Sequence, residues 1–139
     1  FNGRQFNAEL NWDTSRLTSM YSTFQSGIFN QPLAWDTSSV KNMGYTFHGA
    51  TAFDQPLVWD TSKVTYMNGM MNAAYVFNQP LVWDTSQVTD MRYMFGDANA
   101  FDQALEWDTK KVTGTETEEP FILFGQCAAL KPKNEKCST

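Results

Sequence analysis

The sequence predicts a right-handed repeat solenoid of the α/β class, in which short parallel strands alternate with short helices. The first observation is spacing, because five tryptophans follow one another at intervals of 23, 24, 24 and 24 residues. The second is a repeated motif, best preserved as Phe-Asn-Gln-Pro-Leu-Val-Trp-Asp-Thr-Ser at residues 77–86. A fixed period of roughly 20–50 residues is typical of stacked repeats, whose equivalent residues form columns. The expected tryptophan column is Trp12, Trp35, Trp59, Trp83 and Trp107.

The copies of the motif divide the chain into two predicted parts. A partial copy opens the chain at residues 6–12, and full-length turns of the solenoid begin at Trp35, Trp59 and Trp83. The pattern ends after Thr113. We therefore predict a repeat solenoid of four to five turns over residues 1–113. We predict a C-terminal capping segment over residues 114–139, because something must cover the last turn of a solenoid core.

Each turn contains two hydrophobic periods. Leu57 and Trp59 alternate with an intervening residue, as a half-buried strand requires. Met43, Phe47 and Ala50 have the i, i+4, i+7 spacing of one helix face. The expected strands are residues 33–35, 57–59, 81–83 and 105–107, and the expected helical turns are residues 43–49, 67–73 and 91–97. The expected helix N-caps are Thr18, Thr65 and Thr89.

Composition and charge narrow the classes of partner. The chain is 42% hydrophobic and 15% aromatic, which is ample for a core and argues against disorder. Its formal net charge is −5, so nucleic acid is a poor candidate partner. The apolar stretch at residues 121–124 is far too short to span a bilayer, so no direct membrane insertion is expected. We also expect no cofactor.

The repeated motif resembles a known family. The run Trp-Asp-Thr-Ser-x-Val-Thr-x-Met-x-x-Met-Phe-x-x-Ala-x-x-Phe-Asn-Gln-Pro-Leu is similar to the BspA-type bacterial surface protein repeat, also called domain of unknown function 285. The best copy spans residues 83–105, and the resemblance covers residues 6–113. It implies a leucine-rich-repeat-like solenoid on surface-exposed or secreted proteins, with a role in binding or adhesion. It supplies no catalytic residues.

A column of aspartates admits two interpretations. An acidic column can bind calcium in some repeat proteins. An aspartate at a tight corner can instead accept backbone N–H bonds without any metal. We favour the structural interpretation because each turn offers one carboxylate, and we predict no metal site. The column is Asp13, Asp36, Asp60, Asp84 and Asp108.

Three other features have a structural and a functional interpretation. The threonine column at residues 14, 37, 61, 85 and 109 could bind ice, but capping of the corner is the stronger interpretation. The tryptophan column could stack on sugar rings, but equivalent buried residues are what a repeat core needs. His48 has no partner motif for catalysis or metal binding, so we expect it on the helix surface.

Positions that differ between turns define the candidate binding surface. Repeat proteins keep the core fixed and place specificity on variable surface positions. Arginine and tyrosine are also favoured in interfaces. A plain solvated face is the alternative interpretation. The candidate residues are Arg16, Lys63, Tyr66, Asp90, Arg92 and Tyr93.

The leading expectation is a non-enzymatic interaction module that binds a protein or glycan at a cell surface. The alternative is a structural subunit of a larger filament or complex, held by neighbouring subunits. A carbohydrate-active enzyme would need carboxylates and basic residues that break the repeat, and we find no such cluster. Cys127 and Cys137 lie in the last segment, where an internal bridge would favour an extracellular or cell-surface location. Free thiols or a bridge to another chain are the alternatives.

Overall fold

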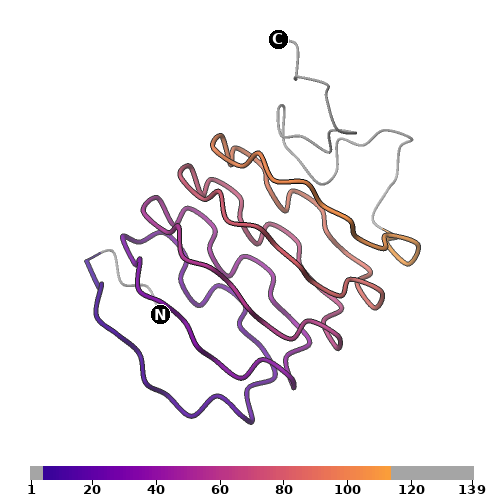
Figure 1. Cartoon of the computed structure of the whole chain (residues 1–139), viewed down its shortest axis with the longest axis horizontal. Coiled ribbons are helices and arrows are strands. Elements are labelled where there is room, and N and C mark those ends of the chain that lie inside the picture. Colours follow the sequence, from indigo (N-terminus) through magenta and orange to yellow (C-terminus); the bar gives the residue numbers. More distant parts are fainter. Residues whose placement is uncertain (1–4, 114–139) are drawn as a thin grey trace.

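The computed structural model describes residues 5–113, and residues 1–4 and 114–139 lie outside the described part. Figure 1 shows the chain winding into coils that stack next to one another. Each of the first four coils consists of an extended arm followed by a turn arm, and the described part of the fifth coil contains an extended arm. The extended arms are residues 5–14, 28–37, 52–61, 76–85 and 100–109, and the turn arms are residues 19–26, 42–49, 66–73 and 90–97. We number the coils from first to fifth in chain order.

The predicted repeat is confirmed, but its predicted α/β content is wrong. Residues 5–113 contain no α-helix and no β-strand. Within them, the strand-like pairing consists of isolated parallel bridges that join Ser19 to Asn42, Asn42 to Tyr66, and Tyr66 to Asp90. These bridges lie at the first residue of each turn arm and do not fall on the four predicted strands. The predicted capping segment and the bridge between Cys127 and Cys137 lie outside the described residues.

Consecutive tight turns replace the predicted helices at residues 43–49, 67–73 and 91–97. The N–H groups of Thr46, His48 and Ala50 donate to carbonyls three residues earlier in their own coil. The N–H groups that alternate with them, those of Tyr45, Phe47 and Gly49, donate to the next coil, and the bond from Tyr45 to the Asn68 carbonyl is 2.9 Å long. Beyond its first turn, a helix would use every N–H group for a bond to the residue four positions earlier. Here half of them hold neighbouring coils together instead.

Left-handed backbone at two positions of every turn arm also excludes a helix. Right-handed helices need negative φ, and positive φ is unfavourable for residues other than glycine. One column has φ between 55° and 59°, at Ser22, Tyr45, Gly69 and Tyr93. The other has φ between 55° and 66°, at Ser26, Gly49, Ala73 and Asp97.

The burial predicted for the turn arms is nevertheless correct. Met43, Phe47 and Ala50 are fully buried, as their spacing indicated. A succession of turns can therefore place residues at i, i+4 and i+7 on one side, just as a helix does. The spacing predicts which side chains face the core but does not predict the backbone that carries them.

The extended arms alternate as predicted, but side chains join them to one another. Leu57 and Trp59 are 3% and 6% exposed, whereas Val58 between them is 94% exposed. The indole N–H of Trp59 donates to the Leu33 carbonyl of the preceding coil at 3.1 Å. Equivalent indole bonds come from Trp35, Trp83 and Trp107. Each tryptophan is thus both a core residue and a link between coils.

Two further sets of side chains link the extended arms. The Thr61 hydroxyl donates to the Asp84 carbonyl of the next coil at 2.9 Å. The Asn30 side chain accepts the N–H of Asp54 at 2.9 Å and the amide of Gln55 at 3.1 Å. The same links recur in the neighbouring coils. These repeated residues of the motif therefore supply either a buried side chain or a hydrogen bond between coils.

Stacked aromatic rings fill the space between the two arms. In the extended arms, Phe53 stacks on Phe77 with ring centroids 6.0 Å apart, and the column continues to Phe29 and Phe101. Phe47 of the turn arm stacks on Phe53 at 4.0 Å and on Trp59 at 5.9 Å. The arms meet through these rings, so their outward sides form opposite faces of each coil.

Candidate binding surface

The variable column at the start of the turn arms brings side chains of different chemistry together. Parallel bridges join its four positions in order, one from each coil. Bridged positions of neighbouring strands lie about 4.8 Å apart. The column reads Ser19, Asn42, Tyr66 and Asp90. Because Tyr66 is half-exposed, its ring is open to a partner beside the Asp90 carboxylate.

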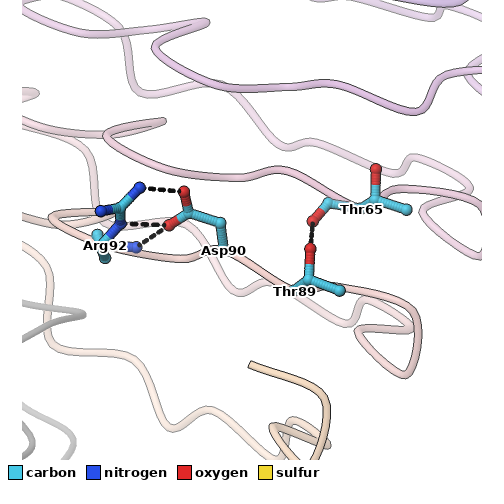
Figure 2. A network of polar contacts seen from close by, with 4 residues as sticks. All are labelled: Thr65, Thr89, Asp90 and Arg92. Atoms are coloured by element: carbon cyan, nitrogen blue, oxygen red, sulfur yellow. Dashed lines mark hydrogen bonds and ion pairs between the residues drawn. The ribbon is translucent and has the colours of Figure 1, made fainter. Parts of the chain in front are cut away.

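Threonine hydroxyls fix the backbone that leads into this column. The Thr89 hydroxyl donates to the Thr65 carbonyl at 3.1 Å, and the Thr65 hydroxyl donates to the Lys41 carbonyl at 3.1 Å. Figure 2 shows the first of these bonds beside Asp90. The predicted role of Thr65 and Thr89 as helix N-caps is therefore wrong, because no helix follows them. Their hydroxyls link successive coils.

Asp90 holds Arg92 in one orientation, as Figure 2 shows. The Arg92 Nε donates to Asp90 Oδ1 at 3.0 Å, and Nη2 donates to Oδ2 at 2.8 Å. The backbone N–H of Arg92 also donates to Oδ1 at 3.0 Å. The Arg92 side chain is 52% exposed and that of Asp90 only 15%. The guanidinium is thus fixed along one edge, and the residue still offers exposed surface to a ligand.

The same contacts shift the ionisation of both groups. Side-chain hydrogen bonds from Arg92 lower the pKa of Asp90, and the backbone bond and the positive charge of Arg92 add to the effect. The hydrogen bonds to Asp90 and its negative charge raise the pKa of Arg92. The pair therefore stays ionised at neutral pH.

Two further tyrosines at positions that vary between turns extend this surface. Tyr21 and Tyr45 meet edge to face with ring centroids 5.7 Å apart. The Tyr45 ring lies over Gly69 of the next coil, where an added Cβ would come within 2.5 Å of it. A tyrosine followed by a glycine one period later, as at Tyr21 and Gly44, is the sequence signal for this packing.

The structure groups four of the six predicted binding residues. Tyr66, Asp90, Arg92 and Tyr93 share the third and fourth turn arms, and Tyr93 is exposed beside Arg92. Arg16 and Lys63 are exposed at the corners that connect extended arms to turn arms. Those two residues are therefore not part of the grouped set.

The aspartate column shapes the corners. Asp60 Oδ1 accepts the Ser62 hydroxyl at 2.6 Å and the Ser62 N–H at 2.9 Å. These two bonds lower the pKa of Asp60, and the charge of Lys63 lowers it further. The same backbone bond forms at Asp13, Asp36, Asp84 and Asp108. Each of these carboxylates closes its own turn, as the structural interpretation predicts.

Residues 5–113 contain neither a metal-binding cluster nor a membrane-spanning helix. No group of three or more His, Cys, Asp or Glu side chains there could hold a metal ion. Over the same residues, no helix is long and apolar enough to cross a membrane.

The other features singled out in the sequence belong to the core or lie beside it. Thr37, Thr61 and Thr85 are 2% exposed, so they form no ice-binding face. Trp35, Trp59 and Trp83 are buried and offer no platform for sugars, whereas Trp12 at the start of the column is 52% exposed. His48 is half-buried beside Tyr45, and its Nδ1 has no hydrogen-bond partner in the described structure.

The chain matches one family model. Its description is "Mycoplasma protein of unknown function, DUF285", and it matches residues 1–58 and residues 33–126. The two matches overlap, as expected when one repeat model fits successive stretches of a periodic chain. Neither a curated protein nor a solved structure matches the chain.

Proposed function

The chain belongs to the DUF285 family, and we propose that it is a non-enzymatic interaction module at a cell surface or outside the cell. Its turn arms bind a protein or glycan partner in this proposal. We further infer that the coils wind right-handedly in a leucine-rich-repeat-like solenoid. These statements rest on the repeat architecture and on the chemistry of its variable face.

The observation that carries the proposal is the contrast between the core and the turn-arm surface. Most core columns repeat one residue type, as in Phe29, Phe53, Phe77 and Phe101, although Thr46, Met70 and Met94 share another column. The bridged surface column instead changes from serine to asparagine, tyrosine and aspartate. Stacking fixes the core columns and leaves the exposed positions free to differ. A repeat scaffold uses such differences for recognition.

The grouped side chains suit a polar partner with some apolar surface. Tyr66 and Tyr93 present half-exposed rings that can pack against aliphatic groups or sugar faces. Arg92 is already oriented by Asp90, so less conformational entropy is lost when it binds. Both features favour binding over catalysis, because each acts by contact and neither supplies a nucleophile.

Glycan-array binding and pull-down from cell-surface extracts test the proposal with a matched pair of variants. The test variant is Tyr66→Ser with Tyr93→Asn, since asparagine tolerates the left-handed backbone at residue 93. The control is Lys110→Ala, which changes a largely exposed side chain at a corner of the fifth coil. We expect a partner that the wild type and the control retain and the test variant loses. Equal retention by all three proteins would contradict the proposal.

A structural subunit of a larger filament or complex is a second candidate, favoured by the first turn arm. The carbonyls of Gly44 and Thr46 accept bonds from the preceding coil. Tyr21 and Thr23 hold the equivalent carbonyls of the first coil, and none of residues 5–113 donates a backbone bond to them. An edge of this kind can accept another polypeptide. Growth into long assemblies with rising concentration, measured by sedimentation velocity, would favour this candidate.

A further inference from the structure

The outward side of the extended arms is an apolar surface distinct from the turn-arm surface. Val58 and Val82 are 94% and 96% exposed, and they stand at equivalent positions of the third and fourth coils. Exposed prolines flank them two residues earlier in each arm. We call this surface the Pro-Val face. It comprises Pro32, Ala34, Pro56, Val58, Pro80 and Val82.

The geometry of the coils makes these side chains one contiguous patch. Residues two apart along an extended chain lie roughly 6.6 Å apart on the same side. Neighbouring coils are separated by a similar distance, since the Phe53 and Phe77 rings beneath the face are 6.0 Å apart. Val58 and Val82 therefore adjoin each other and the two prolines beside them. A contiguous exposed apolar patch marks an interaction site more often than a solvated face.

A row of carboxylates borders the Pro-Val face. Asp36, Asp60 and Asp84 follow it two residues later in each arm and are exposed. Their Oδ1 atoms accept the N–H groups of Ser38, Ser62 and Ser86 at 2.9 Å, which fixes their positions. The carboxylates are also close enough to influence one another, because the charge of Asp60 acts on both Asp36 and Asp84.

Exposed cations stand at the corners beyond this border, at Arg16, Lys41, Lys63, Lys110 and Lys111. Of these, Lys63 lowers the pKa of Asp60 by its charge. The outward positions of residues 28–37, 52–61 and 76–85 include no lysine or arginine. The face therefore combines an apolar strip with an acidic edge.

Charge decides between a second copy of the chain and a different partner. Two copies packed through this face with their arms parallel would bring acidic edges together, and in any orientation each copy carries a net charge of −5. Like charges across an interface are unfavourable, and opposite charges favour association. We propose that the Pro-Val face docks a partner polypeptide whose apolar strip is bordered by lysine or arginine side chains. The turn arms remain free on the opposite side, so the protein can bridge two partners.

A synthetic peptide tests the chemistry directly on the full chain. The probe is a capped ten-residue peptide of alternating valine and lysine, and its control alternates serine and lysine. Binding is measured by fluorescence anisotropy at low and high salt. We expect binding of the valine probe that weakens with salt, because an acidic edge contributes to it. We expect much weaker binding of the serine control.

Two double variants separate the apolar and acidic contributions. Val58→Ser with Val82→Ser should weaken binding about tenfold or more, since the complex would lose the contacts of two valines that the peptide covers. Asp60→Asn with Asp84→Asn should weaken binding and flatten its salt dependence, while asparagine still accepts the serine N–H bonds. Tyr66→Ser with Tyr93→Asn should bind as the wild type does. That last variant separates this proposal from the function proposed for the turn arms.

Three results would overturn the proposal. The first is no binding of the valine probe, or equal binding of the serine control. The second is unchanged affinity in the Val58→Ser and Val82→Ser variant, whose urea midpoint should match the wild type because both positions are exposed. The third is a wild-type dimer in sedimentation that this variant abolishes, because the occupant would then be a second copy.

Discussion

Replacement of Trp59 by alanine should destabilise the protein strongly, because the side chain has two structural roles. It is 6% exposed and stacks between Phe47, at 5.9 Å, and Trp83, at 6.5 Å. Its indole N–H also donates to the Leu33 carbonyl at 3.1 Å. Truncation of a large buried aromatic residue costs about 3–5 kcal/mol. That is a large part of the roughly 5–15 kcal/mol by which a domain is stable.

Two companion variants divide this loss into its parts. Trp59→Phe keeps an aromatic ring but removes the donor to Leu33, so it should cost about 1–3 kcal/mol. Val58→Ala changes the neighbouring exposed residue and should stay within about 0.5 kcal/mol of the wild type. Urea denaturation followed by the fluorescence of the remaining tryptophans measures all three. Equal midpoints for Trp59→Ala and Val58→Ala would refute the assignment of faces, and an unchanged midpoint for Trp59→Phe would refute the role of the indole bond.

Three further predictions concern the backbone, acid stability and the corners. Residues 69 and 73 both have left-handed φ, and residue 69 also lies under the Tyr45 ring. In urea denaturation, Gly69→Ala should therefore lower the free energy of unfolding by more than about 1 kcal/mol. Ala73→Gly should raise it by up to about 1 kcal/mol. Folding lowers the pKa values of Asp36, Asp60 and Asp84, so their stabilisation is complete above the unfolded value of about 3.9 and is lost as pH falls through the lower folded values. The urea concentration at the unfolding midpoint of the wild type should therefore decrease when the pH is lowered below about 4. A variant with asparagine at all three positions should lose less stability over the same pH range. Lys63→Ala should change the free energy of unfolding by less than about 0.5 kcal/mol, since the side chain is exposed, and a larger loss would show that this corner is misplaced.

The sequence predicted the core because burial follows spacing. The alternation around Val58 and the spacing of Met43, Phe47 and Ala50 place inward and outward side chains correctly. The backbone could not be predicted in the same way, because spacing does not reveal whether an N–H group bonds within its coil or to the next one. One signal of left-handed φ was available in Gly69 and, in the other column, in Gly49. In the column of Gly69, the tyrosine at residue 45 hides that signal.

The candidate surface was predictable where the repeat period alone determines which residues of neighbouring coils lie side by side. A repeat of 24 residues places Tyr66 beside Asp90, and the parallel bridge between them agrees. The contact between Asp90 and Arg92 was not predictable from a helical expectation, because residues two apart on a helix do not face each other. In the turn arm the two side chains meet. The exposure of Val58 and Val82 follows from the alternation of inward and outward side chains.

Amide hydrogen exchange tests most directly whether backbone bonds join the turn arms and side chains join the extended arms. The N–H groups of Gly69 and Met71 donate to carbonyls of the next coil at 2.8 and 2.7 Å. Those of Val58 and Val82 have no hydrogen-bond partner among the described residues. Residue-resolved exchange should therefore show strong protection at Gly69 and Met71 and rapid exchange at Val58 and Val82. Comparable protection at all four amides would contradict this architecture, because it would place a backbone ladder in the extended arms.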